Sequence, residues 1–246
     1  MTPPPAAVSD LAPTGTLRAA INVGNPILAA RGASGGEPTG VSVDLSRELA
    51  RRLGVPVKLI VYEAAGKVVE AGKSGAWDIA FVARDPARAA EIAQSPPYVM
   101  IEGSYLVRAN SPVTANEQVD RKGNRVVVGQ NSAYDLFLKR HLKQAEIVRS
   151  PTSPGVVDLF MKGNYEVAAG VRQQLEADAA RLQGVRLLPG RFMAIHQAMA
   201  SQKGKDAGAR FVREFIEEMK ASGFVAKALE RHHVKGAAVA PAGDAG

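Results

Sequence analysis

The sequence predicts an α/β protein of two lobes, each a mostly parallel sheet flanked by helices, with two strands crossing between the lobes. Strand and helix patterns alternate along almost the whole chain of 246 residues. Residues 77–83 are a short, almost wholly apolar run, as expected of a central strand covered on both faces. Two similar alternating series meet near residue 103, and a helical tail follows the second.

The first series predicts three strands joined by two helices. In chain order, the elements are a strand at 17–23, a helix at 43–53, a strand at 55–62, a helix at 66–74 and a strand at 77–83. Leu45, Leu49 and Leu53 recur at one-turn spacing, and Gly54 follows as a C-terminal cap. This order favours parallel strands with right-handed crossovers. The Gly-rich residues 31–40 are expected to form a surface loop or hairpin.

The turn after the third strand contains the first candidate site residue. Asp85 stands where an N-cap belongs, and Pro86 stands at the first helical position. Arg88 falls in the first turn, where a cation opposes the helix dipole. This placement suggests that Arg88 holds an anion at the carboxyl end of the strand, and a solvated surface arginine is the alternative. The following Pro96-Pro97 pair predicts the exit from this strand–turn–helix segment.

The second series begins with a strand at 103–108. Its other strands are expected at 125–129, 145–149, 165–170 and 185–188, and its helices at 132–142, 153–163 and 173–182. Ser132 and Asp135 have the spacing of a capping box at the start of the first of these helices. The chain ends with a return strand and two amphipathic helices, at 192–201, 206–220 and 224–231.

This organisation predicts lobe 1 from residues 15–103 with 196–235, and lobe 2 from residues 104–195. Residues 1–14 and 236–246 are rich in Pro and Ala and are expected to be a flexible arm and a flexible tail. If the helical tail packs on the first series, the chain crosses between the lobes twice. The carboxyl ends of the strands would then line a cleft, where α/β sheets commonly bind ligands.

The composition excludes several kinds of site. The chain has no cysteine, which rules out disulfides, thiolate metal sites and cysteine nucleophiles. Its four histidines have no metal-ligand spacing, so no metal and no cofactor are expected. The net charge of +7 arises from Lys and Arg scattered among Asp and Glu, without long like-charge runs. We interpret this charge as solvated helix faces with a mild preference for anions, and expect no nucleic acid partner.

The sequence also limits where the protein is expected. No stretch is long and apolar enough to span a membrane, and residues 1–15 lack the charged and apolar regions of a secretory signal. The chain is expected to be periplasmic if it is a processed form, and cytoplasmic if Met1 is the true start. No edge or patch stands out as a dimer surface, so a monomer is expected.

Four motifs and the C-terminal helices, in their order and spacing, resemble family 3 solute-binding proteins of ABC transporters, amino-acid receptors with a two-lobed type II periplasmic-binding-protein fold. The motifs are GVSVDLSRELARRLGV at 40–55, GAWDIAFVARDPARAAEIAQSPPY at 75–98, VVVGQNSAYDLFL at 126–138 and VDLFMKGNYEVAAG at 157–170. The resemblance covers about residues 16–235. It implies capture of a small ligand by clam-shell closure, without catalysis, and an ABC permease as partner if the protein is exported.

The resemblance also assigns roles to candidate residues. Arg88 ends a D-P-A-R turn that is similar to the family's T-P-E-R turn, and would clamp the ligand carboxylate with its guanidinium fork. The turn of Asn131, Ser132 and Ala133 would present backbone N–H groups at a helix N-terminus to the same carboxylate. Further contacts would come from one strand end and the first loop, namely Phe81, Val82, Ala83, Asn22 and Asn25.

The chain departs from the family pattern at several positions. Asn22 stands where receptors for basic amino acids carry an Asp that contacts the ligand's distal cation. Val171 or Arg172 stands where the acidic partner of the ligand's α-ammonium is found, and a buried ammonium without a partner is costly. The usual hydroxyl near Ala83 is also absent. We therefore expect a small carboxylate rather than an ordinary α-amino acid, with Arg88 and Arg172 as two positive poles. A solvent-facing helix start is the alternative role for Arg172.

Other functions stay open at this point. Dehydratases that resemble these receptors act on prephenate-like or arogenate-like acids and need a general acid, for which Glu63 and Glu102 are the candidates. Glu63 is also a candidate ligand contact. Similar domains form the effector part of LysR-type regulators, but no helix-turn-helix pattern precedes Leu17, so DNA binding is not expected. A stand-alone cytoplasmic sensor or storage protein is a further alternative.

Overall fold

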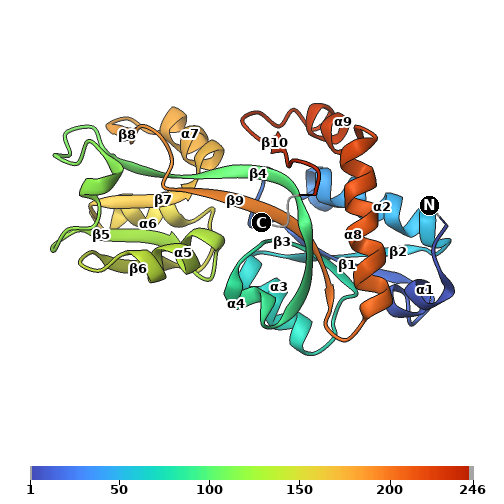
Figure 1. The fold of residues 1–246 in the computed structure, drawn as a ribbon. Helices are drawn as coiled ribbons and strands as arrows, with labels where there is room; N and C mark the ends of the chain where they lie inside the picture. The colour runs from blue at the N-terminus through green and yellow to red at the C-terminus, as the bar shows by residue number, and fades with distance from the viewer. Residues whose placement is uncertain (1, 244–246) are drawn as a thin grey trace. The chain divides into compact units, whose positions relative to one another are not determined.

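The computed structural model describes residues 2–243, and they form two compact units (Figure 1). One unit contains the residues up to Met100 and those from His196 onward, and the other contains Ile101–Ile195. Two long strands, β4 (Ile92–Arg108) and β9 (Met193–Gln202), carry the chain from one unit into the other. Each unit has its own part of the sheet and its own helices.

The three predicted parallel strands lie side by side in the sheet of the first unit, with β2 at its edge. β1 (Leu17–Asn22) pairs in parallel with β2 (Val57–Tyr62) on one side and with β3 (Ile79–Ala83) on the other. β9 then pairs with β3 in the antiparallel direction, and β4 follows β9. The helices of this unit are α1 (Pro5–Leu11), α2 (Val41–Leu53), α3 (Ala65–Lys73), α4 (Pro86–Ala89), α8 (Asp206–Ala221) and α9 (Phe224–Arg231).

Local sequence accounts for how these elements begin and end. α2 ends where Gly54 takes the left-handed conformation, with φ of 70°, and this cap confirms the prediction. Residues 31–40 form the expected surface loop, which contains the 3₁₀ turn η1 (Ala33–Gly35) and is closed by a bridge between Ala30 and Thr39. Trp77 is fully buried, and its indole N–H donates to the carbonyl oxygen of Val68 in α3.

The second unit is a smaller sheet of the same kind. β5 (Arg125–Gly129) pairs in parallel with β6 (Glu146–Ser150) and with β7 (Val167–Val171). The distal half of β4 pairs antiparallel with β7 and with β8 (Val185–Leu187). Its helices are α5 (Ala133–His141), α6 (Val156–Lys162) and α7 (Arg172–Arg181), with a 3₁₀ turn η2 at Asn116–Gln118. The fully buried side chains of Phe160, Leu106 and Val127 belong to its core.

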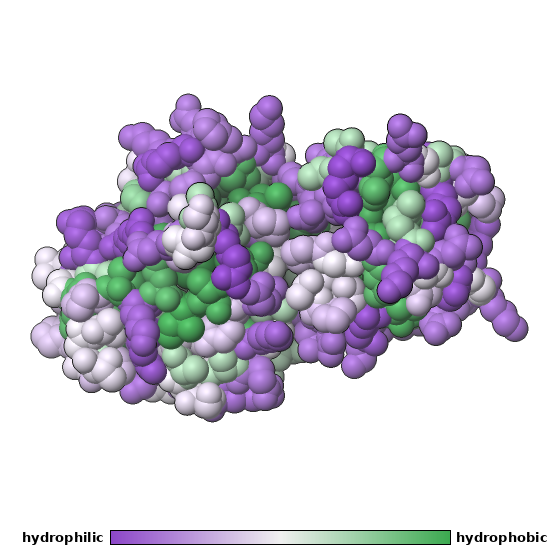
Figure 2. Space-filling view, turned by 180° about the vertical axis from the view of Figure 1, so that it is seen from behind, coloured by the Kyte–Doolittle hydropathy of each residue, from purple (hydrophilic) through white to green (hydrophobic). Residues whose placement is uncertain are grey.

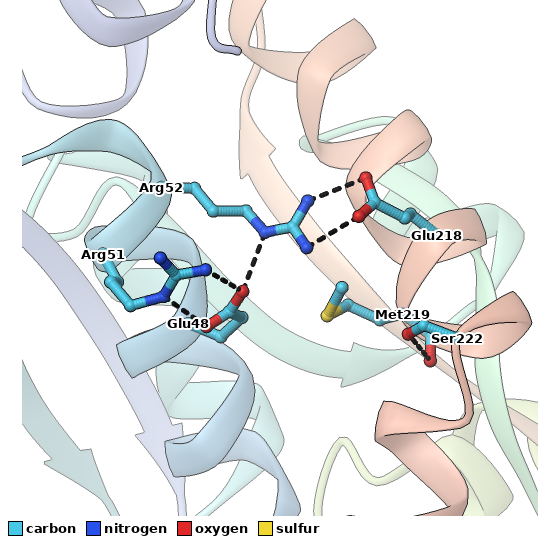
Figure 3. Close-up of polar contacts among 6 residues, drawn as sticks. All are labelled: Glu48, Arg51, Arg52, Glu218, Met219 and Ser222. Atoms are coloured by element: carbon cyan, nitrogen blue, oxygen red, sulfur yellow. Dashed lines mark hydrogen bonds and ion pairs between the residues drawn. The ribbon is translucent and has the colours of Figure 1, made fainter. Parts of the chain in front are cut away.

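An ion-pair chain ties α2 to α8 within the first unit (Figure 3). Glu48 accepts hydrogen bonds from Arg51 at 2.8 Å and from Arg52 at 2.8 Å. Both terminal nitrogens of Arg52 donate hydrogen bonds to the Glu218 carboxylate at 2.7 Å. The Arg52 guanidinium also lies 5.5 Å from the ring centroid of Phe215. This geometry combines a bidentate ion pair with a cation–π contact.

The N-terminal segment differs from the prediction. A flexible arm was expected over residues 1–14, but residues 5–11 form α1, with proline at its start. Ala7 and Leu11 are fully buried, and the Asp10 carboxylate accepts a hydrogen bond at 3.0 Å from the backbone of Gly208 in α8. The Ala and Leu of this segment thus form an apolar stripe that packs on α8, which composition alone did not reveal.

The C-terminal segment also differs. Residues 236–246 were expected to be a flexible tail, but β10 (Ala238–Val239) pairs antiparallel with β4. Residues 244–246 of this prediction lie outside the described part of the chain. Two small apolar residues suffice to extend a sheet, because the pairing uses backbone groups and not side chains.

The predicted exit at the Pro96-Pro97 pair was wrong, since both prolines lie inside β4. Proline has no N–H and normally weakens a strand ladder. Here the neighbouring Ser95 hydroxyl accepts a hydrogen bond from the Met199 backbone at 3.1 Å and donates to the Pro96 carbonyl at 2.7 Å. A side chain thus replaces part of the missing backbone pairing.

Candidate functional site

The first unit places its predicted site residues at one edge of its sheet. Because β1, β2 and β3 are parallel, their carboxyl ends lie at the same edge. The predicted residues in these strand ends and in the segments directly after them are Asn22, Asn25, Glu63, Phe81, Val82, Ala83 and Arg88. We refer to these residues as the Arg88 edge.

Arg88 is held rigidly at this edge. Asp85 caps α4, because its carboxylate accepts a hydrogen bond from the Ala87 N–H at 2.9 Å, as the sequence predicts. Arg88 is only 3% exposed, and its Nη1 donates to the carbonyl oxygen of Ala83 at 2.9 Å. Burial lowers the pKa of Arg88 to about 10 and outweighs the opposing effect of Asp85. The alternative of a solvated surface arginine is therefore wrong.

A residue that sequence reasoning missed shares this carbonyl. Gln94, near the start of β4, donates its side-chain amide to the Ala83 oxygen at 3.1 Å. Phe81 lies edge-on to Tyr98 with ring centroids 6.0 Å apart, and Val82 is buried. These contacts fix the end of β3. The AEIAQSPPY motif contained Gln94, but a polar residue before a Pro-Pro pair gave no reason to single it out.

The loop after β1 is closely packed. The Asn22 side chain accepts a hydrogen bond from the Gly24 N–H at 3.0 Å. A Cβ at Gly24 would lie 2.4 Å from the backbone oxygen of Glu63, so this position needs glycine. The Oδ1 atom of Asn25 is buried and has no hydrogen-bond partner among the described residues. Such an atom is costly when it is left unpaired.

Glu63 is more exposed than a ligand contact would be expected to be. Its carboxylate forms an ion pair with Arg31, and both side chains are about half exposed. Glu102, the other candidate general acid, is also ion-paired, with Arg172 at 2.8 Å and with Arg191 at 3.2 Å.

In the second unit, the predicted turn lies at the N-terminus of α5. Ser132 is the N-cap, and its hydroxyl accepts a hydrogen bond from the Asp135 N–H at 3.1 Å, which confirms the predicted helix start. The N–H of Asn131, whose φ is 56°, donates to the Asp135 carboxylate at 2.8 Å. Helix geometry leaves the N–H groups of Ala133 and Tyr134 without intrahelical partners. These two groups are therefore better placed to bind an anion than the N–H of Asn131.

Two hydroxyl groups that the sequence did not single out support this turn. The Tyr134 hydroxyl donates to the Ser153 hydroxyl at 2.7 Å. A Cβ at Gly129 would lie 2.5 Å from the Ser153 oxygen and 2.8 Å from the Tyr134 oxygen. Gly129 thus allows both side chains to reach the end of β5.

Arg172 begins α7, directly after Val171 at the end of β7. Its Nε donates to Glu102 at 2.8 Å, and its terminal nitrogen bonds the carbonyl of Gly190. Arg191 donates to the other oxygen of Glu102 at 3.2 Å. Two guanidinium groups thus share one carboxylate at the carboxyl end of β7. Arg172 is half-buried and ion-paired, so it is not the solvent-facing arginine of the alternative interpretation.

The predicted residues therefore form two groups, one in each unit. The second group comprises Asn131, Ser132, Ala133, Val171 and Arg172. A separate cavity of about 320 Å³ lies at the opposite edge of the second unit's sheet, where Arg108 ends β4 and Asn124 and Glu166 precede β5 and β7. It contains none of the predicted residues.

Other kinds of site find no support in the described residues. Within residues 2–243 there is no cluster of three His, Asp or Glu residues that could hold a metal ion. The helices of this part of the chain are all too short or too polar to cross a membrane. Hydrophilic residues are spread over both units on the face shown in Figure 2, as expected of solvated charges.

Comparisons with known proteins agree with this architecture. A family model described as bacterial extracellular solute-binding proteins, family 3, matches residues 17–235. A search of curated protein sequences found no match.

Solved structures of similar fold are numerous. The solute receptor for L-cysteine of Neisseria gonorrhoeae has a TM-score of 0.80 at 23% identity, covering 93% of this chain and 94% of that chain. An amino acid ABC transporter substrate-binding protein from Streptococcus pneumoniae, bound to L-arginine, has a TM-score of 0.77 at 18% identity, covering 92% and 97%. The ancestral amino acid-binding protein AncCDT-1, a precursor of cyclohexadienyl dehydratase, has a TM-score of 0.76 at 20% identity, covering 91% and 97%. These likenesses confirm the two-lobed fold.

Proposed function

Because the chain belongs to the bacterial extracellular solute-binding proteins, family 3, we propose that it captures a small organic carboxylate as the receptor component of an ABC transporter. The similar proteins from Neisseria gonorrhoeae and Streptococcus pneumoniae support the receptor role, since they are a solute receptor and a transporter substrate-binding protein. Ligand binding would act by clam-shell closure, in which the ligand shifts an open–closed equilibrium.

The observation that carries this proposal is the buried guanidinium of Arg88. Arg88 is 3% exposed at the carboxyl end of β3, and burial is the largest influence on its pKa. Burial disfavours a charge, and a ligand carboxylate offsets that cost with charge-assisted hydrogen bonds. The arginine remains protonated at neutral pH, so the carboxylate meets a full positive charge.

Two further features support an anionic ligand with a hydrogen-bond donor. The N–H groups of Ala133 and Tyr134 at the start of α5 offer donors aligned with a helix dipole. In the first unit, the buried Oδ1 of Asn25 needs a donor, which a ligand hydroxyl or N–H group would supply. A hydroxy acid meets both requirements.

The ligand class is argued from the residues at the end of β7. Val171 and Arg172 stand where an acidic partner for an ammonium would be expected, and the nearby Glu102 carboxylate is shared by two guanidinium groups. An α-ammonium placed there would face positive charge. We therefore propose that an ordinary α-amino acid binds more weakly than the corresponding hydroxy acid.

Native mass spectrometry of the freshly purified protein would identify a co-purified ligand. Calorimetry with lactate and alanine, which differ only in the hydroxyl or ammonium group, then tests the ligand class. Binding of lactate at least about tenfold tighter than alanine supports the proposal, a difference of roughly 1.4 kcal/mol. Tighter binding of alanine would contradict the ligand class while preserving the receptor function. Chemical conversion of the bound acid, detected by mass spectrometry, would instead favour an enzyme.

A further inference from the structure

The C-terminal segment beyond the family match pairs with the strand that leaves the first unit. The family model ends at residue 235, and β10 follows at Ala238–Val239. Ala238 pairs with Met100 and Val239 pairs with Val99, both in β4. The Ala240 N–H then donates to the Tyr98 carbonyl at 3.1 Å. We call residues 236–243 the strap.

A buried lysine fastens the strap to β4 and to α8. The side chain of Lys220 is 3% exposed, and its ammonium group donates to the carbonyl of Pro97 at 3.2 Å and to that of Pro241 at 2.8 Å. Glu217, one turn earlier in α8, lies 2.6 Å from the same ammonium group and accepts a hydrogen bond from the Gly243 N–H at 3.0 Å. Burial of a charged lysine is tolerated only where partners of this kind are present.

These contacts lie on β4 where the strand leaves the first unit. Residues 97–100 are the last of the first unit before the strand passes into the second unit at Ile101. Pro96 and Pro97 have no backbone N–H, so this part of β4, which lies beside β9 in the sheet, has two fewer backbone donors. The strap and Lys220 supply hydrogen bonds at Pro97, Tyr98, Val99 and Met100. The segment in which bending between units would begin is thereby braced.

We propose that the strap restricts bending of β4 where it leaves the first unit, and so slows the exchange between open and closed forms. Only the relevance of this exchange to ligand capture rests on the proposed function, because the exchange itself is measured without ligand. A braced strand must break these contacts, or carry them through the motion, before the units move. Loss of the strap therefore lowers the barrier in both directions.

The test uses single-molecule fluorescence transfer on the full chain. The sequence has no cysteine, so Ser74→Cys in the first unit and Lys122→Cys in the second provide unique sites for two dyes. Ala240→Pro removes the hydrogen bond to Tyr98, and Ala242→Pro is the control because it alters the same segment at an exposed position. A chain that ends at Lys235 is a second strap variant.

The expected result is exchange at least about fivefold faster in Ala240→Pro and in the shortened chain, as the loss of one or two hydrogen bonds implies. Hydrogen exchange at residues 97–101 should rise in parallel, and Ala242→Pro should match the parent. Unchanged exchange rates, together with faster hydrogen exchange in β4, would overturn the proposal. So would the absence of exchange between two forms in every variant. Failure to bind any carboxylate would affect only the proposed function, since no ligand is present in this experiment.

Discussion

Arg88 Nη1 and the carbonyl oxygen of Ala83 are joined by a hydrogen bond of 2.9 Å across the turn between β3 and α4. The same carbonyl accepts from Gln94 at 3.1 Å, so its acceptor capacity is filled by two side chains. This arrangement orients the guanidinium before any ligand arrives. Preorganisation of this kind reduces the ordering cost of binding.

Arg88→Ala should abolish the stabilisation of the protein by its carboxylate ligand. The lost charge-assisted hydrogen bonds predict binding at least about tenfold weaker. Arg88→Lys should also bind poorly, because an ammonium lacks the planar fork. The shift in Tm with ligand, followed by calorimetry, measures both variants. Arg47→Ala, which removes an exposed arginine of the same unit, is the control. An unchanged ligand-dependent Tm shift in Arg88→Ala would disprove the clamp.

Ser132→Ala should destabilise the N-terminus of α5. Its hydroxyl caps the helix by accepting from Asp135, and loss of such a cap costs about 1 kcal/mol. Ser132→Gly should lose only a few tenths of a kcal/mol, because glycine is tolerated at this position. Urea unfolding of the two variants provides the comparison. Equal stability of Ser132→Ala and the parent would show that the cap contributes nothing.

Glu48 should make the free energy of unfolding depend on pH in the acidic range. Hydrogen bonds from Arg51 are the main cause that lowers the pKa of Glu48 to about 2, from an ordinary value near 4.5. A carboxyl with a depressed folded pKa contributes stability that is fully present above its unfolded pKa. That contribution is lost as the pH falls through the folded value. The window therefore runs from about pH 4.5 down to about pH 2.

Glu48→Gln should lower the free energy of unfolding at pH 7 and flatten its change between pH 4.5 and 2. Urea unfolding across this range measures the effect. Glu37→Gln is the matched control, because Glu37 forms an exposed ion pair with Arg47. Parallel pH profiles for the parent and Glu48→Gln would show that the ion-pair chain of Figure 3 does not act in this way.

The sequence predicted the fold well because local signals agreed with the final packing. The apolar run before Ala83, the cap at Asp85 and the glycine at position 54 each identify an element boundary by a short-range mechanism. The prolines of β4 and the strap were missed because their order depends on distant groups. Ser95 bonds Met199, which lies more than a hundred residues away in the sequence. Lys220 of α8 bonds the strap, which is a separate element.

The candidate site was predictable in part. Arg88 and the α5 cap follow from local sequence and from the family resemblance, and both lie at strand ends as expected. The pairing of Arg172 with Glu102 was not predictable, because it joins the start of α7 to β4 through the sheet register. The Gln94 contact was missed for the same reason: two strands bring it to Ala83.

Gly24→Ala should disturb the Arg88 edge without changing any charge. A Cβ there would lie 2.4 Å from the Glu63 backbone oxygen and 2.9 Å from the Asn22 side chain, so the loop must move. Overpacking of this kind costs about 1–3 kcal/mol, and ligand affinity should fall with it. Gly36→Ala is the control, since its closest contact would be 3.2 Å in an exposed loop. Urea unfolding and calorimetry provide the two measurements. Full affinity in Gly24→Ala would place the ligand away from this loop.

Arg172 should set a preference for ligands with two carboxylates. Its guanidinium and that of Arg191 share the single carboxylate of Glu102, while Glu176 is exposed and lies 3.9 Å from Arg172. A second ligand carboxylate at this place would accept hydrogen bonds from the guanidinium groups of Arg172 and Arg191. Succinate should therefore bind at least about tenfold tighter than butyrate, which has the same chain length, since a hydrogen bond to a charged group is worth roughly 1.5–3 kcal/mol. Arg172→Ala should remove this preference and leave butyrate binding nearly unchanged.

Arg181→Ala, which removes an exposed arginine from the same helix, is the control and should keep the preference for succinate. Calorimetry with both acids distinguishes these outcomes, and an undiminished preference in Arg172→Ala would show that Arg172 only begins α7 and pairs with Glu102.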